Sequence, residues 1–567
     1  MSKKEKILFF LIFTLAAFLR LWHLGQAPPG LYSDEVDVAY QARLFLDQKT
    51  DYFGNSWPIH FHSFADWRTP GYIYSALPFI ALADPSATAV RLPAALWGLL
   101  SLLAFFHLCK KIFKQTGPAL LALALLSFSP WHIHYSRIAF EVTGMLFFIL
   151  LGLSFLLSFL KKPKPHFFLI SFSSFILSTY FYSTAKLFVP IILLAALFFW
   201  WPLFKKTLLS RRFLPSFLLL FLLALPMIRS LAAGEAGFRF SYINIFTDPT
   251  TPQEIDRLRE TDAVILNQGQ KEVGMSTPLS SKIFHNKLLF WGQTGLKNYL
   301  QAFSTQFLFI SGDQNPRHGF LKTGMLYPLE FFIIILSLIF FVPSKEKTFF
   351  LTLLFLTPLP FALTRDEPGA HATRLFLLLP FLYLLEANGL ALIYQKLKRL
   401  PRIIIFSSLA TAYLLSFILF SHHYLYHYPG LSERYWNAAT QEVVQKAFAS
   451  QEKFDHIYFS QSSHQSLLPF FLFWNNYHET LSQINLQPAS DSFIDGEYFD
   501  KFYFGQLNLG SAYNDPTNFF KKENLYLLES ADLPPKLLED HSLSFTIIDQ
   551  INYPASAFPA YYLVTGL

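Results

Sequence analysis

Two adjacent carboxylates, Asp34 and Glu35, follow the first hydrophobic stretch of the chain and come soon after the turn sequence Pro28-Pro29-Gly30. Carboxylates so close to hydrocarbon are costly unless they are solvated, paired or functional. A carboxylate at this depth can meet a lipid-borne reagent from the bilayer and a polar acceptor from the water. The pair therefore indicates chemistry at a membrane surface. Asp37, one helical turn after Asp34, is interpreted as a solvated neighbour.

A set of cationic side chains is expected on the same side of the membrane as the carboxylate pair. Its members are Arg68, Arg137, Lys186, Arg229, Arg317, His318, Arg365, His371 and Arg374. Arginine and lysine neutralise phosphate oxygens while a bond to the phosphate breaks, and a nearby carboxylate can take the proton of an attacking hydroxyl. The pattern predicts transfer from a phosphate-linked donor. No Gly-rich phosphate loop precedes a helix, so a soluble nucleotide donor is not indicated.

Several of these side chains also have structural interpretations. Arg137 and Glu141 are four residues apart, which is the spacing of an ion pair within one helix. Arg229 and Arg374 are placed where an arginine can extend along apolar surface to the membrane interface. The histidines lack the spacing of zinc ligands, whereas the oxygens of Asp34 and Glu35 are of the type that holds a divalent cation. No other cofactor is expected.

The composition is that of a polytopic membrane protein. Of the 567 residues, 53% are hydrophobic and 15% are charged. Apolar runs such as residues 217–225 recur too often for a soluble core, and 66 Phe with 27 Tyr fit a helical bundle better than a barrel of alternating strands. The net charge of +7 lies mainly in short clusters between apolar runs, so it indicates topology and not a nucleic-acid partner. The single Cys109 excludes an intrachain disulfide.

The basic clusters predict the orientation of the chain, because basic loops are retained in the cytoplasm. Those clusters lie at residues 3–6, 110–114, 161–164, 205–212, 345–347 and 396–402. About eleven helical spans follow, each needing roughly 20 residues. They fall near 7–24, 88–109, 118–133, 142–160, 166–182, 187–204, 213–230, 326–343, 347–364, 374–394 and 403–421. The N-terminus is then inside and the C-terminus outside, and the first span is expected to be retained as an anchor, since no small-residue cleavage site follows it.

This topology divides the chain into a transmembrane domain, residues 1–421, with outer loops at 25–87 and 231–325, and an extracytoplasmic domain, residues 422–567. Within the first loop, residues 71–80 are too short to cross and predict an interfacial helix. The tail is long enough for a domain of its own. One amphipathic stretch, 435–449, and three β-rich runs, 455–460, 525–529 and 544–549, predict a small α/β fold.

The chain resembles the membrane glycosyltransferases of the C superfamily. The resemblance is greatest to bacterial relatives of the dolichyl-phosphate-mannose protein mannosyltransferases and of the lipid A aminoarabinose transferase. The matching motifs are Tyr32-Ser33-Asp34-Glu35, Arg68-Thr69-Pro70-Gly71-Tyr72, Ala89-Val90-Arg91-Leu92-Pro93 and His134-Tyr135-Ser136-Arg137. The resemblance covers residues 1–230 well and extends more loosely to about residue 420. Where many relatives have Lys-Pro-Pro, this chain has Arg68-Thr69-Pro70.

The resemblance implies an inverting transferase that takes sugar from a polyprenyl-phosphate donor outside the cytoplasmic membrane. It implies that Asp34 is the general base, that Glu35 positions the acceptor or a cation, and that Arg137 and Lys186 contact the donor phosphate. Arg68, Arg317, His318, His371 and Arg374 are further candidates for the phosphate. The acceptor would be a protein, a lipid or a glycan. The alternatives are a transporter or flippase of lipid-linked glycans, a non-catalytic scaffold displaying the tail, and a superfamily enzyme that transfers whole lipid-linked glycans.

Overall fold

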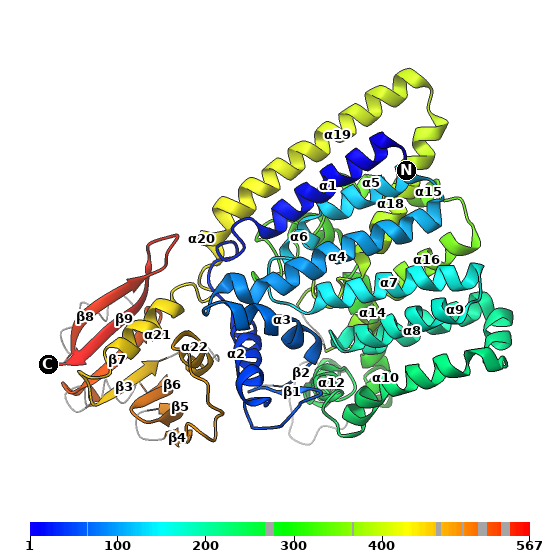
Figure 1. The fold of residues 1–567 in the computed structure, drawn as a ribbon. Coiled ribbons are helices and arrows are strands. Elements are labelled where there is room, and N and C mark those ends of the chain that lie inside the picture. Colours follow the sequence, from blue (N-terminus) through cyan, green and yellow to red (C-terminus); the bar gives the residue numbers. More distant parts are fainter. Residues whose placement is uncertain are drawn as a thin grey trace. The chain divides into compact units, whose positions relative to one another are not determined.

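The computed structural model describes residues 1–64, 66–266, 277–365, 368–460, 466–489, 493–508, 519–533 and 545–567. The chain divides into two compact units whose segments alternate along the sequence. Unit 1 comprises residues 1–12, 101–132 and 145–413, and unit 2 comprises residues 13–100, 133–144 and 414–567. Figure 1 shows the fold, with most of the helices and strands labelled.

Unit 1 is a bundle of apolar helices. After α4 (Ala87–Phe113), which enters it from unit 2, come α5 (Thr116–Ser127), α6 (Pro130–Tyr135), α7 (Val142–Lys161), α8 (Pro165–Thr179), α9 (Ser183–Leu208) and α10 (Leu214–Ala232). The later helices are α15 (Pro328–Ile339), α16 (Lys345–Leu356), α17 (Leu359–Ala362), α18 (Leu378–Lys396) and α19 (Arg399–His422). In Figure 1, α8 lies beside α9 and α10, and both contacts are made in the structure.

The predicted spans fall on helices, and among the described residues six helices are long and apolar enough to cross a membrane. Several other apolar helices are shorter than a full span. The expected span at 118–133 is wrong as one continuous helix, because α5 ends at Ser127 and a new short helix begins at Pro130. The span expected at 347–364 is likewise divided between α16 and α17. In both places a proline begins or precedes the second helix, where its fixed φ suits a first turn.

Close approach of backbones holds part of the bundle together. α15 packs against α18, and a Cβ added to Gly389 would lie 1.9 Å from the hydroxyl of Ser337. Small residues at such crossings let membrane helices touch over their length. The polar connection after α10 also belongs to unit 1. It forms α11 (Phe238–Ile243), α12 (Thr250–Leu266), α13 (Leu279–Phe284), α14 (Lys287–Gln301) and a π-helix, Gln306–Ile310.

Unit 2 combines the first outer segment with the tail. Its helices are the second half of α1 (Lys3–Leu21), then α2 (Ser33–Gln48), α3 (Pro70–Leu82), α20 (Tyr428–Ser432), α21 (Thr440–Ala449) and α22 (Leu468–Trp474). A two-residue hairpin, β1 (Phe61–His62) with β2 (Trp67–Arg68), precedes α3. The helix predicted at 71–80 is therefore observed as α3.

The tail forms a mixed sheet in the order β4-β5-β6-β3-β7-β9-β8. The strands are β3 (His456–Ser460), β4 (Gln487–Ala489), β5 (Phe493–Phe499), β6 (Phe502–Leu507), β7 (Asn524–Glu529), β8 (Phe545–Asn552) and β9 (Pro559–Gly566). Central β3 is parallel to β6 and β7, with Tyr458 opposite Tyr503 and Tyr526, and the other pairings are antiparallel. The α/β tail is as predicted, although Ser544, the first residue of one predicted strand, lies outside the described residues.

One apolar core joins the tail to the first outer segment. Val443 and Val444 of α21 and Phe471 of α22 are buried together with Ile457 of the sheet and Tyr72 of α3. α2 packs directly against both α3 and α22. The helix that carries Asp34 and Glu35 is thus fixed by the core of the tail. The division at residues 421 and 422 stays a prediction.

Candidate active site

The carboxylate pair lies in the first turn of α2. Gly30 has φ +63°, and a Cβ there would lie 2.5 Å from the carbonyl oxygen of Trp436, so glycine fits this turn both in conformation and in space. Tyr32 is the extended N-cap residue, and its backbone N–H donates to Glu35 Oε2 over 3.1 Å. Two carboxylates in a first turn are favoured by the positive end of the helix dipole. Local sequence therefore sets where the helix begins and where the pair lies.

Both carboxylate oxygens of Glu35 accept hydrogen bonds. Arg91 of α4 donates to both of its oxygens at 2.8 Å, and the backbone N–H of Ala139 donates to Oε1 at 2.8 Å. The side chains of Glu35 and Arg91 are 0% exposed. Arg91 also donates to the carbonyls of Pro28 and Gly30, at 2.7 and 2.6 Å. A bidentate buried pair of this kind ties α2, α4 and the preceding turn together. The geometry suits Glu35 for positioning the turn that carries Asp34.

Asp34 keeps an open face. Its side chain is 30% exposed, and Arg68 Nη2 lies 2.5 Å from its Oδ1. The Nε of Arg68 donates to Asp37, which also accepts a 3.0 Å hydrogen bond from the hydroxyl of Ser63. The expectation that Asp37 is solvated is wrong, because its side chain is 6% exposed beneath Arg68. Burial alone lowers the pKa of Arg68, but the adjacent charges of Asp34 and Asp37 raise it well above its usual value.

Arg137 makes four hydrogen bonds to backbone carbonyls. They run to Ala27 at 3.0 Å, Leu19 at 2.7 Å, Trp22 at 2.8 Å and His23 at 3.0 Å, and Arg137 is 1% exposed. The guanidinium thus satisfies carbonyls at the C-terminal end of α1 and in the following turn, groups that have no partner within the helix. The interpretation of Arg137 and Glu141 as neighbours along one helix is wrong, because α6 ends at Tyr135.

Replacement of Arg137 by methionine is expected to destabilise the protein. The change leaves carbonyls at the end of α1 without their donor and removes a cation from a helix C-terminus, worth up to about 2 kcal/mol. Thermal unfolding of the purified variant should shift to lower temperature, while the affinity of the folded fraction for polyprenyl phosphate is unchanged. A lost affinity at unchanged melting temperature would instead assign Arg137 to the donor phosphate.

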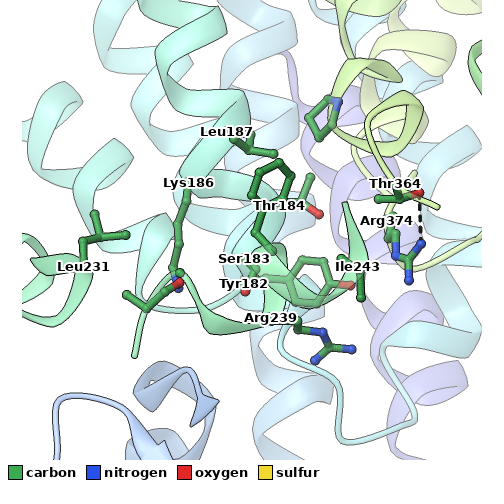
Figure 2. Close-up of a pocket in the computed structure, with 14 residues that line it drawn as sticks. Tyr182, Ser183, Thr184, Lys186, Leu187, Leu231, Arg239, Ile243, Thr364 and Arg374 are labelled. Carbon is green, nitrogen blue, oxygen red and sulfur yellow. Dashed lines mark hydrogen bonds between the residues drawn. The ribbon is translucent and has the colours of Figure 1, made fainter. Parts of the chain in front are cut away.

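A basic cavity lies in unit 1. It encloses about 210 Å³, and Lys186 of α9, Arg239 of α11 and Arg374 before α18 reach it from three segments (Figure 2). The ammonium of Lys186 donates to the carbonyl of Ala236 at 2.7 Å, and Arg374 donates to the hydroxyl of Thr364 at 3.2 Å. No carboxylate is among the described residues that line it. Three cations on the wall of one cavity favour an anionic ligand such as a phosphate.

Arg317, His318 and His371 lie close to the cations of this cavity. The rings of His318 and His371 are 4.8 Å apart, and Thr373 Oγ1 lies 3.1 Å from His318 Nδ1. Burial lowers the pKa of His371 well below its usual range, and neighbouring positive charges, first that of Arg374, lower it further. The other charges that act on His371 are those of Arg239, Arg317 and His318. The lowered pKa favours the neutral imidazole of His371, which offers a hydrogen bond, not a charge, to a phosphate.

Asp313 organises the loop beneath these histidines. Its Oδ2 accepts from the backbone N–H of Ala372 at 2.7 Å and lies 3.9 Å from His371 Nδ1. Arg317 is held by Asn315, whose Oδ1 accepts from both its backbone N–H and its Nε, at 3.0 and 3.3 Å. Within the described ranges, no three His, Cys, Asp or Glu side chains come together as metal ligands. Glu35, proposed as a cation ligand with Asp34, has its oxygens in hydrogen bonds to Arg91 and backbone N–H groups.

Sequence reasoning missed two contributors to these sites. Arg239 was not singled out, because it lies in a polar loop among other charges; its place between Phe238 and Phe240 is the signal that a cation there is anchored by apolar neighbours. Arg91 was noted as part of a motif but not as the partner of Glu35. The two residues are 56 positions apart, and no local rule connects them.

Residues 68–228 match the family model described as dolichyl-phosphate-mannose-protein mannosyltransferase. The solved structure of ArnT from Cupriavidus metallidurans bound to undecaprenyl phosphate is similar over 100% of this chain and 99% of that one, with 10% identity and a TM-score of 0.53. The Archaeoglobus fulgidus oligosaccharyltransferase tethered with an acceptor peptide gives 12% identity and a TM-score of 0.49 over 84% of this chain and 64% of that one. No curated protein matches in sequence.

These findings confirm the resemblance to the C superfamily that the sequence motifs indicated. The chain shares its fold with ArnT over its whole length. The matched segment, residues 68–228, contains Arg68, Arg91, Arg137 and Lys186.

Proposed function

We propose that this protein is an inverting glycosyltransferase that moves a sugar from a polyprenyl-phosphate donor to an acceptor at the outer face of the cytoplasmic membrane. The mannosyltransferase family that matches residues 68–228 is described by a dolichyl-phosphate-linked sugar, and ArnT, which shares the fold, was solved with undecaprenyl phosphate. Both names point to a lipid phosphate as the group that carries the sugar. The acceptor is a hydroxyl-bearing protein, lipid or glycan.

One observation carries the proposal: the basic cavity contains Lys186, which lies within the segment that matches the mannosyltransferase model. When the bond between sugar and phosphate breaks, negative charge develops on the departing phosphate. Fixed cations that face that charge stabilise the transition state, because they need no reorganisation as it forms. Lys186, Arg239 and Arg374 are the groups proposed for this role.

Asp34 is proposed as the general base. The acceptor hydroxyl loses its proton to Asp34 while its oxygen bonds to the anomeric carbon, and the bond from that carbon to the phosphate oxygen breaks with its electron pair leaving as polyprenyl phosphate. Attack opposite to the leaving group inverts the anomeric centre. Three carboxylates in the first turns of α2, Asp34, Glu35 and Asp37, are each paired with an arginine. Asp34 suits the role because its side chain is 30% exposed, whereas those of Glu35 and Asp37 are 0% and 6% exposed. Arg68, whose Nη2 lies 2.5 Å from Asp34 Oδ1, orients this carboxylate.

The experiment that tests the function is transfer of radiolabelled sugar from synthetic polyprenyl-phosphate sugars to cell-envelope acceptors by the purified protein. Label should move with the native protein, and the product should have inverted anomeric configuration. A parallel reaction with a chelator tests whether a divalent cation is needed. Absence of both turnover and donor binding across a panel of competent donors would contradict the proposal and favour the scaffold or transporter alternative.

Replacement of Arg239 by glutamine is expected to weaken binding of polyprenyl phosphate about tenfold or more, because one charge-assisted hydrogen bond contributes roughly 1.5–3 kcal/mol. Titration of the lipid phosphate against the purified variant measures the change in Kd. Arg257 of α12 is the matched control, since it lies in the same outer loop with a side chain 64% exposed. Equal losses in Arg239→Gln and Arg257→Gln would show that general charge, and not the cavity, attracts the donor.

A further inference from the structure

A second cavity lies at another end of unit 1, away from the proposed reaction. It encloses about 300 Å³ where α4, α7, α16 and α18 meet. It shares no described lining residue with the cavity around Lys186. Lys161, on its wall, ends α7 just before α8, whereas Tyr182, on the wall of the first cavity, comes just after α8. The 15 residues of α8 span about 22 Å, so the two cavities are at different levels of the bundle.

The walls of this second cavity are strongly basic. Four lysines line it, Lys111, Lys114, Lys161 and Lys347, against one carboxylate, that of Glu346. They come from three of the loops whose positive charge predicted the cytoplasmic side of the membrane. Retention of these loops in the cytoplasm explains why they contain basic residues, but it does not explain why the lysines line one cavity. Four positive charges around one cavity favour binding of an anion.

Two of the lysines, Lys111 and Lys161, are held in place by hydrogen bonds at the ends of the helices. Lys111 donates to the carbonyl of Ser154 at 2.8 Å and to the hydroxyl of Ser158 at 2.5 Å. Lys161 donates to the carbonyl of Lys111 at 3.1 Å. Ser344 caps the N-terminus of α16 by accepting from the N–H of Lys347, so the positive end of a 12-residue helix also faces this region. Charges with fixed positions bind a ligand at lower entropic cost than free side chains do.

Asn388 provides an independent sign of a ligand. It lines the cavity, is 4% exposed, and its side-chain nitrogen donates to no group in the part of the chain that the structure describes. A buried donor left unsatisfied is destabilising, and such groups are rare in native proteins. An acceptor oxygen placed in the cavity would satisfy the amide and meet the lysines together. A phosphate group has both the negative charge that the lysines attract and the acceptor oxygens that the Asn388 amide needs.

We infer that this cavity binds a phosphate-bearing anion, either the headgroup of an anionic membrane lipid or a free phosphate compound. Lys114, Lys347 and Asn388 are the groups that contact it. The apolar side chains of Phe113 and Leu392 also line the cavity, and they give a lipid glycerol or acyl chain a surface to pack on. The site is separate from the proposed transfer of sugar, so it can exist whatever the reaction of the protein is.

The test measures ligand-induced stabilisation of the full-length protein after removal of bound lipid in a zwitterionic detergent. Phosphatidylglycerol, phosphatidylcholine and inorganic phosphate are added separately, and the melting temperature and Kd are recorded. Phosphatidylglycerol should raise the melting temperature and phosphatidylcholine should not. A comparable response to inorganic phosphate would identify a soluble phosphate as the ligand, and a response to phosphatidylglycerol alone would identify a lipid headgroup.

The variant Lys114→Gln/Lys347→Gln should bind phosphatidylglycerol about 30-fold more weakly, because each lysine facing an anionic headgroup contributes about 1 kcal/mol and a tenfold change is about 1.4 kcal/mol. Asn388→Asp, nearly identical in shape, should also weaken binding by repelling the anion. The matched control is Lys205→Gln/Lys206→Gln at the end of α9, which removes the same charge outside the cavity. Equal Kd values in all variants, or equal stabilisation by phosphatidylcholine, would overturn the inference.

Discussion

Asp34→Asn is expected to reduce the rate of sugar transfer about 10²–10⁴-fold, the range attributed to a general base. The amide has nearly the shape of the carboxylate but cannot take the proton of the acceptor hydroxyl. Because Asp34 is 30% exposed and is not part of an apolar core, its replacement should leave the fold intact. The measurement is kcat for transfer of labelled sugar, accompanied by the melting temperature of the same preparation.

Asp47→Asn is the matched control for this experiment. Asp47 lies near the other end of α2 and is 38% exposed, with His478 Nδ1 2.6 Å from its Oδ2. Both variants remove one partly exposed, paired carboxylate from the same helix, but only Asp34→Asn removes the proposed base. Full activity in Asp34→Asn would take Asp34 out of the mechanism. Equal loss in both variants would indicate disturbance of α2 instead of lost catalysis.

Much of the architecture could be predicted from the sequence, because it depends on local patterns. Runs of apolar residues set the helices, and β-rich runs set strands such as Asn524–Glu529 close to their observed bounds. The errors arose where a proline interrupted an apolar run. Pro130 begins a new helix inside the expected span 118–133, and the hydropathy of the flanking residues conceals that break.

The roles of individual charges were harder to predict, because they depend on residues far apart in the chain. Asp34, Glu35 and Asp37 are almost equivalent in sequence. In the structure, Arg91 forms an ion pair with the buried Glu35, whereas Arg68 contacts both Asp34 and Asp37. Which carboxylate stays open is decided by these two arginines. The same holds for Arg137, whose acceptors at the end of α1 lie more than a hundred positions away.

Arg91→Met is expected to cause the largest loss of stability, about 3–5 kcal/mol, because removal of one partner leaves the buried charge of Glu35 uncompensated. It also frees the carbonyls of Pro28 and Gly30, which fix the turn before Asp34. Thermal unfolding in detergent should show a marked fall in melting temperature. Transfer activity should fall with the folded fraction, since the turn that carries the base is released.

The double variant Glu35→Gln/Arg91→Met separates a positioning role for Glu35 from a catalytic one. Glutamine at position 35 carries no charge and so does not require a cation. The double variant should therefore be more stable than Arg91→Met alone. Such non-additive changes in the free energy of unfolding are typical of residues in direct contact. If Glu35 only positions the turn, the folded fraction of the double variant should regain part of its transfer activity and keep the native KM for the acceptor. If stability returns while kcat stays as low as in Asp34→Asn, the charge of Glu35 takes part in the reaction itself. The 2.8 Å contacts that Arg91 makes with both oxygens of Glu35 favour the first outcome, because a carboxylate so fully bonded has little capacity left for a substrate.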